Sequence, residues 1–379
     1  MAVVAVTAGA GTVIGWGAVS VRDVAPMPDV EPAVGSVIPP VLDLDPTDCD
    51  GLSLAERAGL LLVVGLPGVT EVDNPLIDLL AEVGVGGVML RDENLIDRDQ
   101  ASQLIAGLRL RLGADLLVAV DEEGGRVTSL RALGDRTPSA RRLGSSGPDQ
   151  ARAAGVDLAQ RAGSVGIDWI LAPVVDLDAG PFDGVIGDRS FGDDPAVVAD
   201  VAAAFADGLR SGGLAITVKH FPGHGGSSDP HAGTVVDDID RDALLTERLG
   251  PFRTLIERGA EAVMVGHVTY PNALGPGPAS LEPAAYGLLR ATGFDGVAIT
   301  DALGMGAVHT RWGFDRAPAV AVAAGADAVL VTQGGSAQVL REGLVNAVST
   351  GTLDEGRLDE AVNRVQRLRG AAPTSGSCP

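Results

Sequence analysis

The sequence predicts a single (β/α)8 barrel of the TIM type. From about residue 52 onwards, eight short apolar runs alternate with longer Ala-, Leu- and Arg-rich segments of helical period. Charged residues and histidines directly follow most of these runs, where the C-terminal rim of a barrel would lie. The rival arrangement is an open, doubly wound sheet. No Gly-x-Gly-x-x-Gly motif follows the first strand, which disfavours the dinucleotide-binding version of that sheet.

The predicted strands are short and almost wholly apolar, as expected of parallel strands that are buried on both faces. In chain order they are Leu61–Val64, Gly86–Leu90, Leu116–Val120, Trp169–Val174, Ala215–Val218, Ala262–Val265, Gly296–Thr300 and Ala328–Val331. The segments between them have the spacing of helices, for example Asp99–Leu112, Pro195–Arg210, Arg241–Arg258 and Arg316–Ala324.

Composition and charge narrow the class of protein. The chain has 379 residues, of which 46% are hydrophobic and only 3% aromatic, so its core must be aliphatic. The formal net charge is -22 and no cluster of Lys and Arg is present, which argues against nucleic acid or an anionic membrane surface as a partner.

The two ends of the chain differ from the predicted barrel, which spans residues 51–370. Residues 1–22 are apolar and resemble a signal or anchor, although no Lys or Arg precedes Arg22. Residues 23–50 form a linker rich in proline and acidic residues, and residues 371–379 form a tail. These features predict export or attachment to the cell envelope, with the cytoplasm as the alternative.

Two cysteines, Cys49 and Cys378, lie near opposite ends of the predicted domain. The first and last elements of a closed barrel are neighbours, so a disulfide could join the two cysteines and close a very long loop. Such a bond would indicate an oxidising compartment. The alternative is two unrelated free thiols.

Three of the five histidines fall in the run from Lys219 to His231, which begins at a strand end and continues into glycine and serine. Asp229-Pro230-His231 has the pattern of an acid/base pair in which the aspartate orients and polarises the imidazole. The alternative is a solvent-exposed loop with an incidental histidine. His220 and His224 are four residues apart, but the intervening Pro222-Gly223 argues against a helix, and we predict no metal site.

The other candidate residues each have a structural alternative. Asp301 follows a buried strand and could be a nucleophile or a helix N-cap. Asp121 and Arg126 flank Gly124-Gly125 and could bind sugar hydroxyls or form a structural bridge. Lys219 and His220 could bind a polyhydroxylated ligand, or Lys219 could form a buried ion pair. The remaining assignments are Arg189 as a ligand contact, His267 as a packed histidine at the rim, Asp176 and Asp178 as rim residues, and no role for His309.

Taken together, these segments resemble the bacterial β-N-acetylglucosaminidases of glycoside hydrolase family 3. The matching motifs are Asp121-Glu-Glu-Gly-Gly-Arg-Val127, Gly187-Asp-Arg-Ser-Phe-Gly192, Lys219-His-Phe-Pro-Gly-His-Gly225 with Asp229-x-His231, Met264-Val-Gly-His-Val268 and Ile299-Thr-Asp301. They occur in the order of the family and extend across nearly the whole predicted barrel. The Lys219–His231 run is the most specific, because it separates this branch from the family's β-glucosidases.

The resemblance implies a TIM barrel and a retaining mechanism without a cofactor. It implies that Asp301 is the nucleophile and that His231 is the acid/base with Asp229 as its partner. It also implies that the terminal sugar is bound by Asp121, Arg189, Lys219 and His220. The implied substrate is an oligosaccharide with terminal β-linked N-acetylglucosamine, as in peptidoglycan fragments or chitooligosaccharides. We expect the protein to be a monomer. The alternatives are a β-glucosidase or phosphorylase of the same family, or a degenerate sugar-binding protein.

Two positions depart from the pattern of the family. Pro230 stands where the family usually has serine, which puts the closure of the loop in question. Ser129 stands where the family tends to have an arginine. Arg131 is the candidate to replace that arginine, and otherwise one sugar contact is lost.

Overall fold

The computed structural model describes residues 51–225, 229 and 233–370. Cys49, Cys378, Pro230, His231 and the segments 1–50 and 371–379 lie outside the described residues, so the predictions made for them remain predictions. Within the described residues, no helix has both the length and the apolar character needed to cross a membrane.

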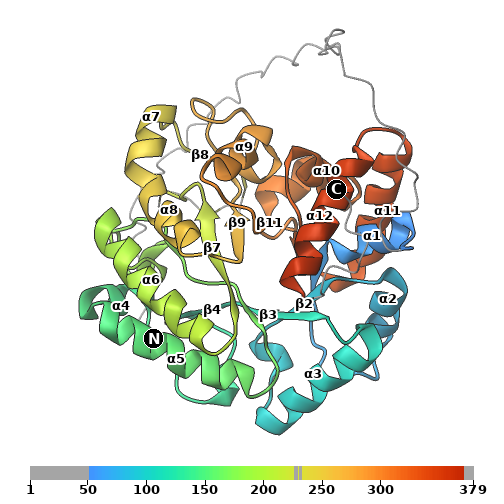
Figure 1. The fold of residues 1–379 in the computed structure, drawn as a ribbon, viewed down its shortest axis with the longest axis horizontal. Coiled ribbons are helices and arrows are strands. Elements are labelled where there is room, and N and C mark those ends of the chain that lie inside the picture. Colours follow the sequence, from blue (N-terminus) through green and yellow to red (C-terminus); the bar gives the residue numbers. More distant parts are fainter. Residues whose placement is uncertain (1–50, 226–228, 230–232, 371–379) are drawn as a thin grey trace, which may run out of the picture. The chain divides into compact units, whose positions relative to one another are not determined.

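Eight parallel strands form a closed barrel at the centre of the described residues (Figure 1). Their order is β11-β9-β7-β6-β3-β2-β1-β12. The two ends of this series meet at a bridge between Ile299 and Ala328, where Thr300 N donates to Ala328 O at 3.1 Å. The strands are β1 (Leu62–Gly65), β2 (Gly87–Leu90), β3 (Leu117–Val120), β6 (Trp169–Ile170), β7 (Ala215–Phe221), β9 (Ala262–Val265), β11 (Val297–Thr300) and β12 (Val329–Val331). The predicted barrel is therefore confirmed, and the open sheet is wrong.

Helices surround the strands (Figure 1). They are α1 (Leu54–Leu60), α2 (Pro75–Val83), α3 (Arg98–Leu112), α4 (Ala140–Ser146), α5 (Pro148–Gly163), α6 (Pro195–Ser211), α7 (Arg241–Ala243), α8 (Leu249–Glu257), α9 (Pro283–Ala291), α10 (Gly306–Ala324), α11 (Ala337–Ser349) and α12 (Glu355–Leu368). Local sequence explains many of their ends. In α6, for example, the Asp194 carboxylate caps the first turn and Pro195 occupies a position that needs no amide donor.

Three predicted elements differ from the structure. The fourth strand ends at Ile170, four residues earlier than expected. Beyond it, the carbonyls of Ala172 and Pro173 still accept hydrogen bonds from β7, and a bridge joins Val174 to Lys219, but Pro173 has no N–H to donate to a ladder. The predicted helix Arg241–Arg258 is divided into α7, a π-helical segment (Leu244–Arg248) and α8. The last predicted helix begins ten residues earlier than expected, as α10, with a break at Gly313, whose φ is 66°.

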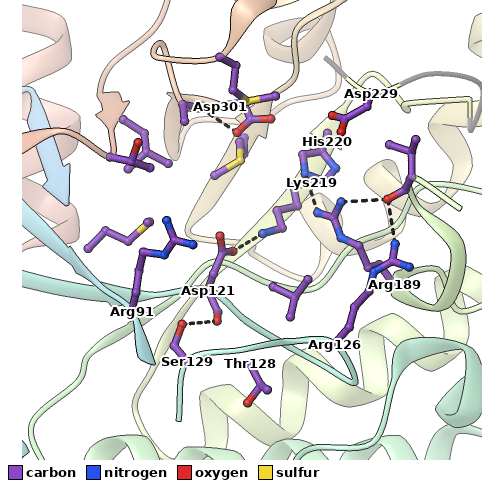
Figure 2. A pocket seen from close by; sticks show the side chains of 18 of the residues that line it. Arg91, Asp121, Arg126, Thr128, Ser129, Arg189, Lys219, His220, Asp229 and Asp301 are labelled. Carbon is purple, nitrogen blue, oxygen red and sulfur yellow. Dashed lines mark hydrogen bonds and ion pairs between the residues drawn. The ribbon is translucent and has the colours of Figure 1, made fainter. Parts of the chain in front are cut away.

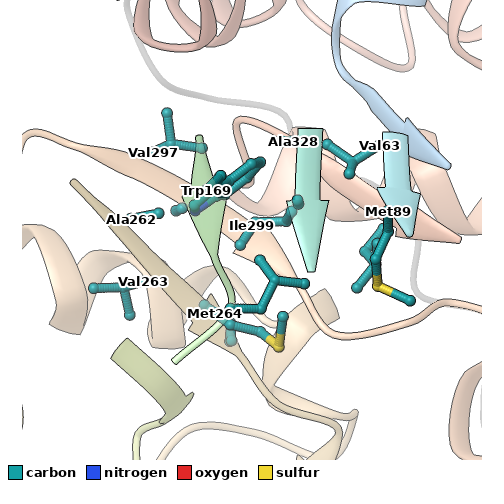
Figure 3. Close-up of a cluster of buried hydrophobic side chains, with 14 of the residues drawn as sticks. Val63, Met89, Trp169, Ala262, Val263, Met264, Val297, Ile299 and Ala328 are labelled. Carbon is teal, nitrogen blue, oxygen red and sulfur yellow. The ribbon is translucent and has the colours of Figure 1, made fainter. Parts of the chain in front are cut away.

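The barrel interior is aliphatic, as the composition predicts. Side chains from several strands meet there, and Figure 3 labels Val63, Met89, Val263, Met264 and Ile299 among them. Trp169 is the large aromatic exception, and its Nε1 donates to Thr217 Oγ1 at 2.7 Å, so its polar atom is satisfied. This packing fixes the strand ends that carry the site.

Two short strand pairs lie beyond the barrel strands. An antiparallel hairpin, β4 (Glu122–Gly124) and β5 (Val127–Thr128), follows β3. A parallel pair, β8 (Val235–Val236) and β10 (Val268–Thr269), lies beyond β7 and β9. Both pairs follow the C-terminal ends of barrel strands and extend the rim at which the predicted site residues gather.

Candidate active site

A cavity of about 790 Å³ opens at the C-terminal ends of the barrel strands (Figure 2). Its apolar lining includes Met89, Met264, Met305 and Leu330. Its polar lining comes from the end of β7 and from the segments after β2, β3, β6, β7, β11 and β12. Every predicted site residue that lies within the described part of the chain lines this cavity. These residues are Asp121, Arg126, Arg189, Lys219, His220, Asp229 and Asp301.

Asp301 directly follows β11, and its N–H continues the ladder by donating to Val265 O at 2.9 Å. Its Oδ1 accepts a hydrogen bond from Ala302 N at 2.7 Å. Asp301 does not cap the following helix, because Met305 occupies the N-cap position of α10. The structural alternative for this residue is therefore wrong, and the carboxylate remains available in the cavity wall.

Burial alone would raise the pKa of Asp301, because a buried carboxyl resists ionisation. The nearby His267 and His220, the hydrogen bond from Ala302 and the charge of Lys219 outweigh burial and lower this pKa to about 2. Asp301 is consequently ionised at neutral pH, which is the state that a carboxylate nucleophile requires.

Lys219, on β7, is 1% exposed and reaches across the barrel to the end of β3. Its Nζ lies 2.5 Å from Asp121 Oδ1 and 2.7 Å from Glu123 Oε1. These two carboxylates raise the pKa of Lys219 although burial opposes them. The predicted buried ion pair is thus confirmed, and it leaves the half-buried Asp121 carboxylate facing the cavity.

Arg189 shares the other side of Glu123. Its Nε and Nη2 lie 2.6 and 2.9 Å from the two Glu123 oxygens, so the pair is bidentate. Burial opposes ionisation of Glu123, but Arg189 and Lys219 hold the pKa of this carboxyl well below its usual range. Arg189 Nη2 also lies 3.3 Å from His220 Nε2, so Glu123 and Arg189 link three strand ends.

Asp176 lies beneath the turn that follows β7 and is fully buried. Its carboxylate lies 2.7 Å from His220 Nδ1 and accepts the backbone N–H groups of His220 and His224 at 3.2 and 2.6 Å. Burial opposes ionisation, but the two histidines lower the pKa of Asp176. This carboxylate therefore fixes the orientation of His220 in the cavity wall.

Glu122, between Asp121 and Glu123 in sequence, holds the rim hairpin. Its buried carboxylate accepts hydrogen bonds from Thr128 Oγ1, the N–H groups of Ser129 and Leu130, and Thr137 Oγ1, at 2.8 to 3.1 Å. Three consecutive acidic residues thus have three different surroundings: a cavity wall, a hairpin and a buried ion pair.

Arg126 lines the cavity, but its guanidinium is largely engaged elsewhere. It donates to four backbone carbonyls of the loop at residues 182–186, at 2.5 to 3.0 Å, and lies 3.3 Å from Asp188 Oδ1. The structural alternative, an Arg–Asp bridge at the barrel rim, is therefore confirmed, with Asp188 and not Asp121 as the partner of Arg126. Through these contacts Arg126 fixes the loop that forms one wall of the cavity.

Ser129 is nearly buried, and its Oγ donates to Asp121 O at 2.8 Å. Two arginines line the cavity near it: Arg131, whose Nη1 lies 3.6 Å from Asp92, and Arg91, directly after β2. The Arg91 guanidinium makes no ion pair within the described residues. Figure 2 shows Arg91, Asp121 and Ser129 on one side of the cavity, across from Asp301 and Asp229.

His267 is packed, as the sequence predicts. It is 1% exposed, its Nδ1 lies 2.7 Å from Ser280 Oγ, and its Nε2 lies 3.0 Å from Ala302 O, one residue beyond Asp301. His309 is exposed and contacts the Phe314 ring at a centroid distance of 4.4 Å, outside the cavity lining.

The sequence predicts no role in the site for Glu123, His224 and Arg91, and it places Asp176 at the rim without a function. Asp176 had a signal, since it follows a predicted strand, and Glu123 lies within the motif after the third strand. Their partners, however, come from other strands that are distant in sequence. Arg91 carries no local pattern that separates it from surface residues. His224 lies within the Lys219–His231 run, but the sequence suggests only a metal-ligand role for it.

Comparison with known proteins supports a common origin. Residues 53–368 match the glycosyl hydrolase family 3 N-terminal domain. Beta-hexosaminidase LpqI of Mycobacterium tuberculosis is 39% identical over 339 residues, which cover 86% of this chain and 85% of that protein. A beta-hexosaminidase of Stenotrophomonas maltophilia is 38% identical over 281 residues, covering 72% of this chain and 83% of its own length.

Solved structures agree. That of M. tuberculosis LpqI superposes with a TM-score of 0.78 at 38% identity, covering 85% of this chain and 95% of LpqI. A family 3 β-N-acetylglucosaminidase from Paenibacillus sp. gives a TM-score of 0.80 at 33% identity; 86% of this chain spans 65% of that longer protein. The chain therefore belongs to glycosyl hydrolase family 3.

Proposed function

We propose that the protein is a retaining exo-β-N-acetylhexosaminidase. It would release terminal β-linked N-acetylglucosamine from peptidoglycan fragments or chitooligosaccharides. Membership of family 3 and the beta-hexosaminidase relatives support the reaction class. The observation that carries the mechanism is the ionised Asp301 carboxylate in the wall of a polar cavity that also contains Asp229, Lys219 and His220.

The reaction proceeds in two displacements. The Asp301 carboxylate attacks the anomeric carbon while His231 gives a proton to the departing glycosidic oxygen, and a covalent glycosyl-aspartate forms. Neutral His231 then removes a proton from water, which displaces Asp301 and restores the original anomeric configuration. Asp229 orients the imidazole and stabilises its charged form. A histidine acid avoids placing a second anionic carboxylate beside Asp301.

Binding of the terminal sugar orients its anomeric carbon. Asp121 offers a carboxylate oxygen to sugar hydroxyls, and Lys219 and Arg189 present donors that Glu123 already holds in place. His220 presents a ring edge that Asp176 orients. Because these side chains are fixed before substrate arrives, little ordering remains to be done on binding. Arg126 contributes indirectly, by holding the wall at residues 182–186.

The direct test is a paired assay of the wild type and Asp301→Ala with aryl N-acetyl-β-glucosaminide and aryl β-glucoside. We expect wild-type hydrolysis of the first substrate, much weaker hydrolysis of the second, and no activity in the variant. Preference for the glucoside would make the protein a β-glucosidase. A rate that increases with inorganic phosphate, with formation of a sugar 1-phosphate, would make it a phosphorylase.

We also propose that the protein is exported and that Cys49 and Cys378 form a disulfide. Thiol titration of native protein from its source, with and without reductant, tests this proposal. We expect no titratable thiol before reduction and two after it. Two free thiols in the native protein would contradict both the bond and this argument for export.

A further inference from the structure

His224 is a buried residue of the cavity wall whose ring lacks hydrogen-bond partners. It is 5% exposed and lines the cavity, yet neither Nδ1 nor Nε2 makes a hydrogen bond within the described residues. Most buried polar side-chain atoms in proteins have a partner. Both ring nitrogens of His220 and His267, by contrast, lie within hydrogen-bonding distance of neighbouring groups. The exception at His224 points to a partner that enters the cavity.

The backbone, and not the ring, holds His224 in place. Its N–H donates to Asp176 Oδ1 at 2.6 Å. The preceding Gly223 is fixed as well, since its N–H donates to His220 O at 2.8 Å and its carbonyl accepts from Tyr270 Oη at 2.6 Å. The ring stands edge-on to that of His220, at a centroid distance of 6.3 Å. Its two nitrogens are therefore not required to maintain this turn.

The charge state of the ring limits what it can bind. Burial lowers the pKa of His224, and the attraction of Asp176 opposes this shift without cancelling it. A neutral imidazole has one donor and one acceptor nitrogen. Such a ring matches a hydroxyl or an amide better than it matches an anion, which a charged arginine or lysine would hold more strongly.

We propose that His224 is a substrate-binding residue whose ring hydrogen-bonds an uncharged group of the terminal sugar, either a hydroxyl or the 2-acetamido group. This inference rests on the proposed function, since it uses a sugar whose anomeric carbon lies at Asp301. Asp301, Asp229 and His224 line the same cavity, and Asp301 is near enough for its charge to act on the His224 ring. A sugar held for reaction at Asp301 would therefore lie close to His224.

Two substitutions separate binding from folding. His224→Leu keeps much of the volume but removes both nitrogens, and His224→Gln retains a donor and an acceptor. We expect His224→Leu to raise the KM for aryl N-acetyl-β-glucosaminide and the inhibition constant of N-acetylglucosamine by about tenfold, the size of one hydrogen bond. Its melting temperature should not fall, because the His224 ring makes no hydrogen bond with the described residues that the substitution could remove. His224→Gln should recover part of the affinity.

The matched control is His309→Leu, the same substitution at an exposed histidine outside the cavity, which should leave KM unchanged. The same measurements with aryl glucoside and glucose identify the group contacted. A loss confined to the N-acetylated compounds indicates the acetamido group, and equal losses indicate a hydroxyl; both results support the proposal.

A folded His224→Leu protein with wild-type KM and inhibition constants would overturn the proposal. So would a melting temperature that falls while affinity is retained, because that result indicates a purely structural role. Failure of the proposed function is distinguishable: the wild type would then hydrolyse neither glycoside. In that case calorimetric titration of wild type and His224→Leu with N-acetylglucosamine still tests the contact.

Discussion

Glu123 Oε1 lies 2.7 Å from Lys219 Nζ, and each side chain is only 2% exposed. The second oxygen of Glu123 lies 2.6 Å from Arg189 Nε. One buried carboxylate is therefore the shared counter-ion of two cations, one on β7 and one in the loop after β6. Because the site has its cationic side chains in these positions before substrate arrives, Glu123 is a positioning residue as well as a structural one.

Substitution of Glu123 by Gln should affect stability and activity together. The variant leaves Lys219 and Arg189 without their shared charge, and removing one partner of a buried ion pair costs about 3–5 kcal/mol of unfolding free energy. Displacement of the two cations should lower kcat/KM on the order of 100-fold. Denaturant unfolding and aryl-glycoside kinetics measure the two effects.

The control for this prediction is Glu360→Gln. Glu360 also pairs with an arginine, Arg357, but is 64% exposed, so its loss should change stability by less than about 1 kcal/mol. Equal effects of the two substitutions, or a Glu123→Gln protein of wild-type activity, would show that the buried pair does not position the site.

Asp327 is, like Glu123, a buried carboxylate that pairs with cations, but it lies far from the cavity. It precedes β12, at the N-terminal end of the barrel, and pairs with Arg290, Arg357 and Arg364. Asp327→Asn should lower the unfolding free energy by about 3 kcal/mol or more, since three guanidinium groups lose one shared charge. The kcat measured well below the melting temperature should not change. A large loss of kcat in the folded variant would contradict this division between the two ends of the barrel.

Protonation of Asp301 should not reduce activity in the mildly acidic range. Its folded-state pKa of about 2 lies below its ordinary value of 3.8. Ionised Asp301 therefore contributes to stability at neutral pH, and this contribution is lost as pH falls from about 4 towards 2. Between pH 4 and 6, kcat/KM should show no decline caused by protonation of the nucleophile. A pH–rate profile, with folding monitored by circular dichroism, tests this prediction. It would be contradicted if kcat/KM of the folded protein fell with a midpoint near pH 5 and NMR showed that Asp301 takes up its proton over the same range.

His231→Ala should distinguish a proton donor from a merely structural histidine. Loss of general acid catalysis costs about 10²–10⁴-fold for a leaving group that needs a proton. The loss should be much smaller for a dinitrophenyl glycoside, whose leaving group departs as an anion. The ratio of kcat/KM for the two glycosides, in wild type and variant, is the measurement. Equal losses for both substrates would mean that His231 is not the acid.

Much of the fold could be predicted because the signal for each strand is local. All eight predicted strands overlap observed ones, and the residues directly after them, such as Asp121, Lys219 and Asp301, line one cavity as expected. Closure of a parallel barrel brings its strand ends together whatever their separation in sequence. The place of the site thus followed from the fold class alone.

The roles of the individual charged residues could not be predicted in the same way. Asp121, Glu122 and Glu123 are adjacent and chemically alike, and only their partners distinguish them: Asp121 and Glu123 pair with cations from distant segments, whereas Glu122 binds the hairpin that follows it. Arg126 likewise fits a sugar contact in sequence, yet in the structure it holds backbone carbonyls at residues 182–186. Such pairings depend on contacts between distant segments, for which a single sequence carries no periodic pattern.

The most direct test of double displacement through Asp301 is to trap the covalent intermediate. Wild-type enzyme is incubated with a fluorinated N-acetylglucosaminyl fluoride, digested and mapped by mass spectrometry. We expect one added sugar on the wild-type peptide that contains Asp301, and no added sugar on the same peptide of Asp301→Ala. A label on another carboxylate, or steady turnover with inversion at the anomeric carbon and no labelled peptide, would contradict it.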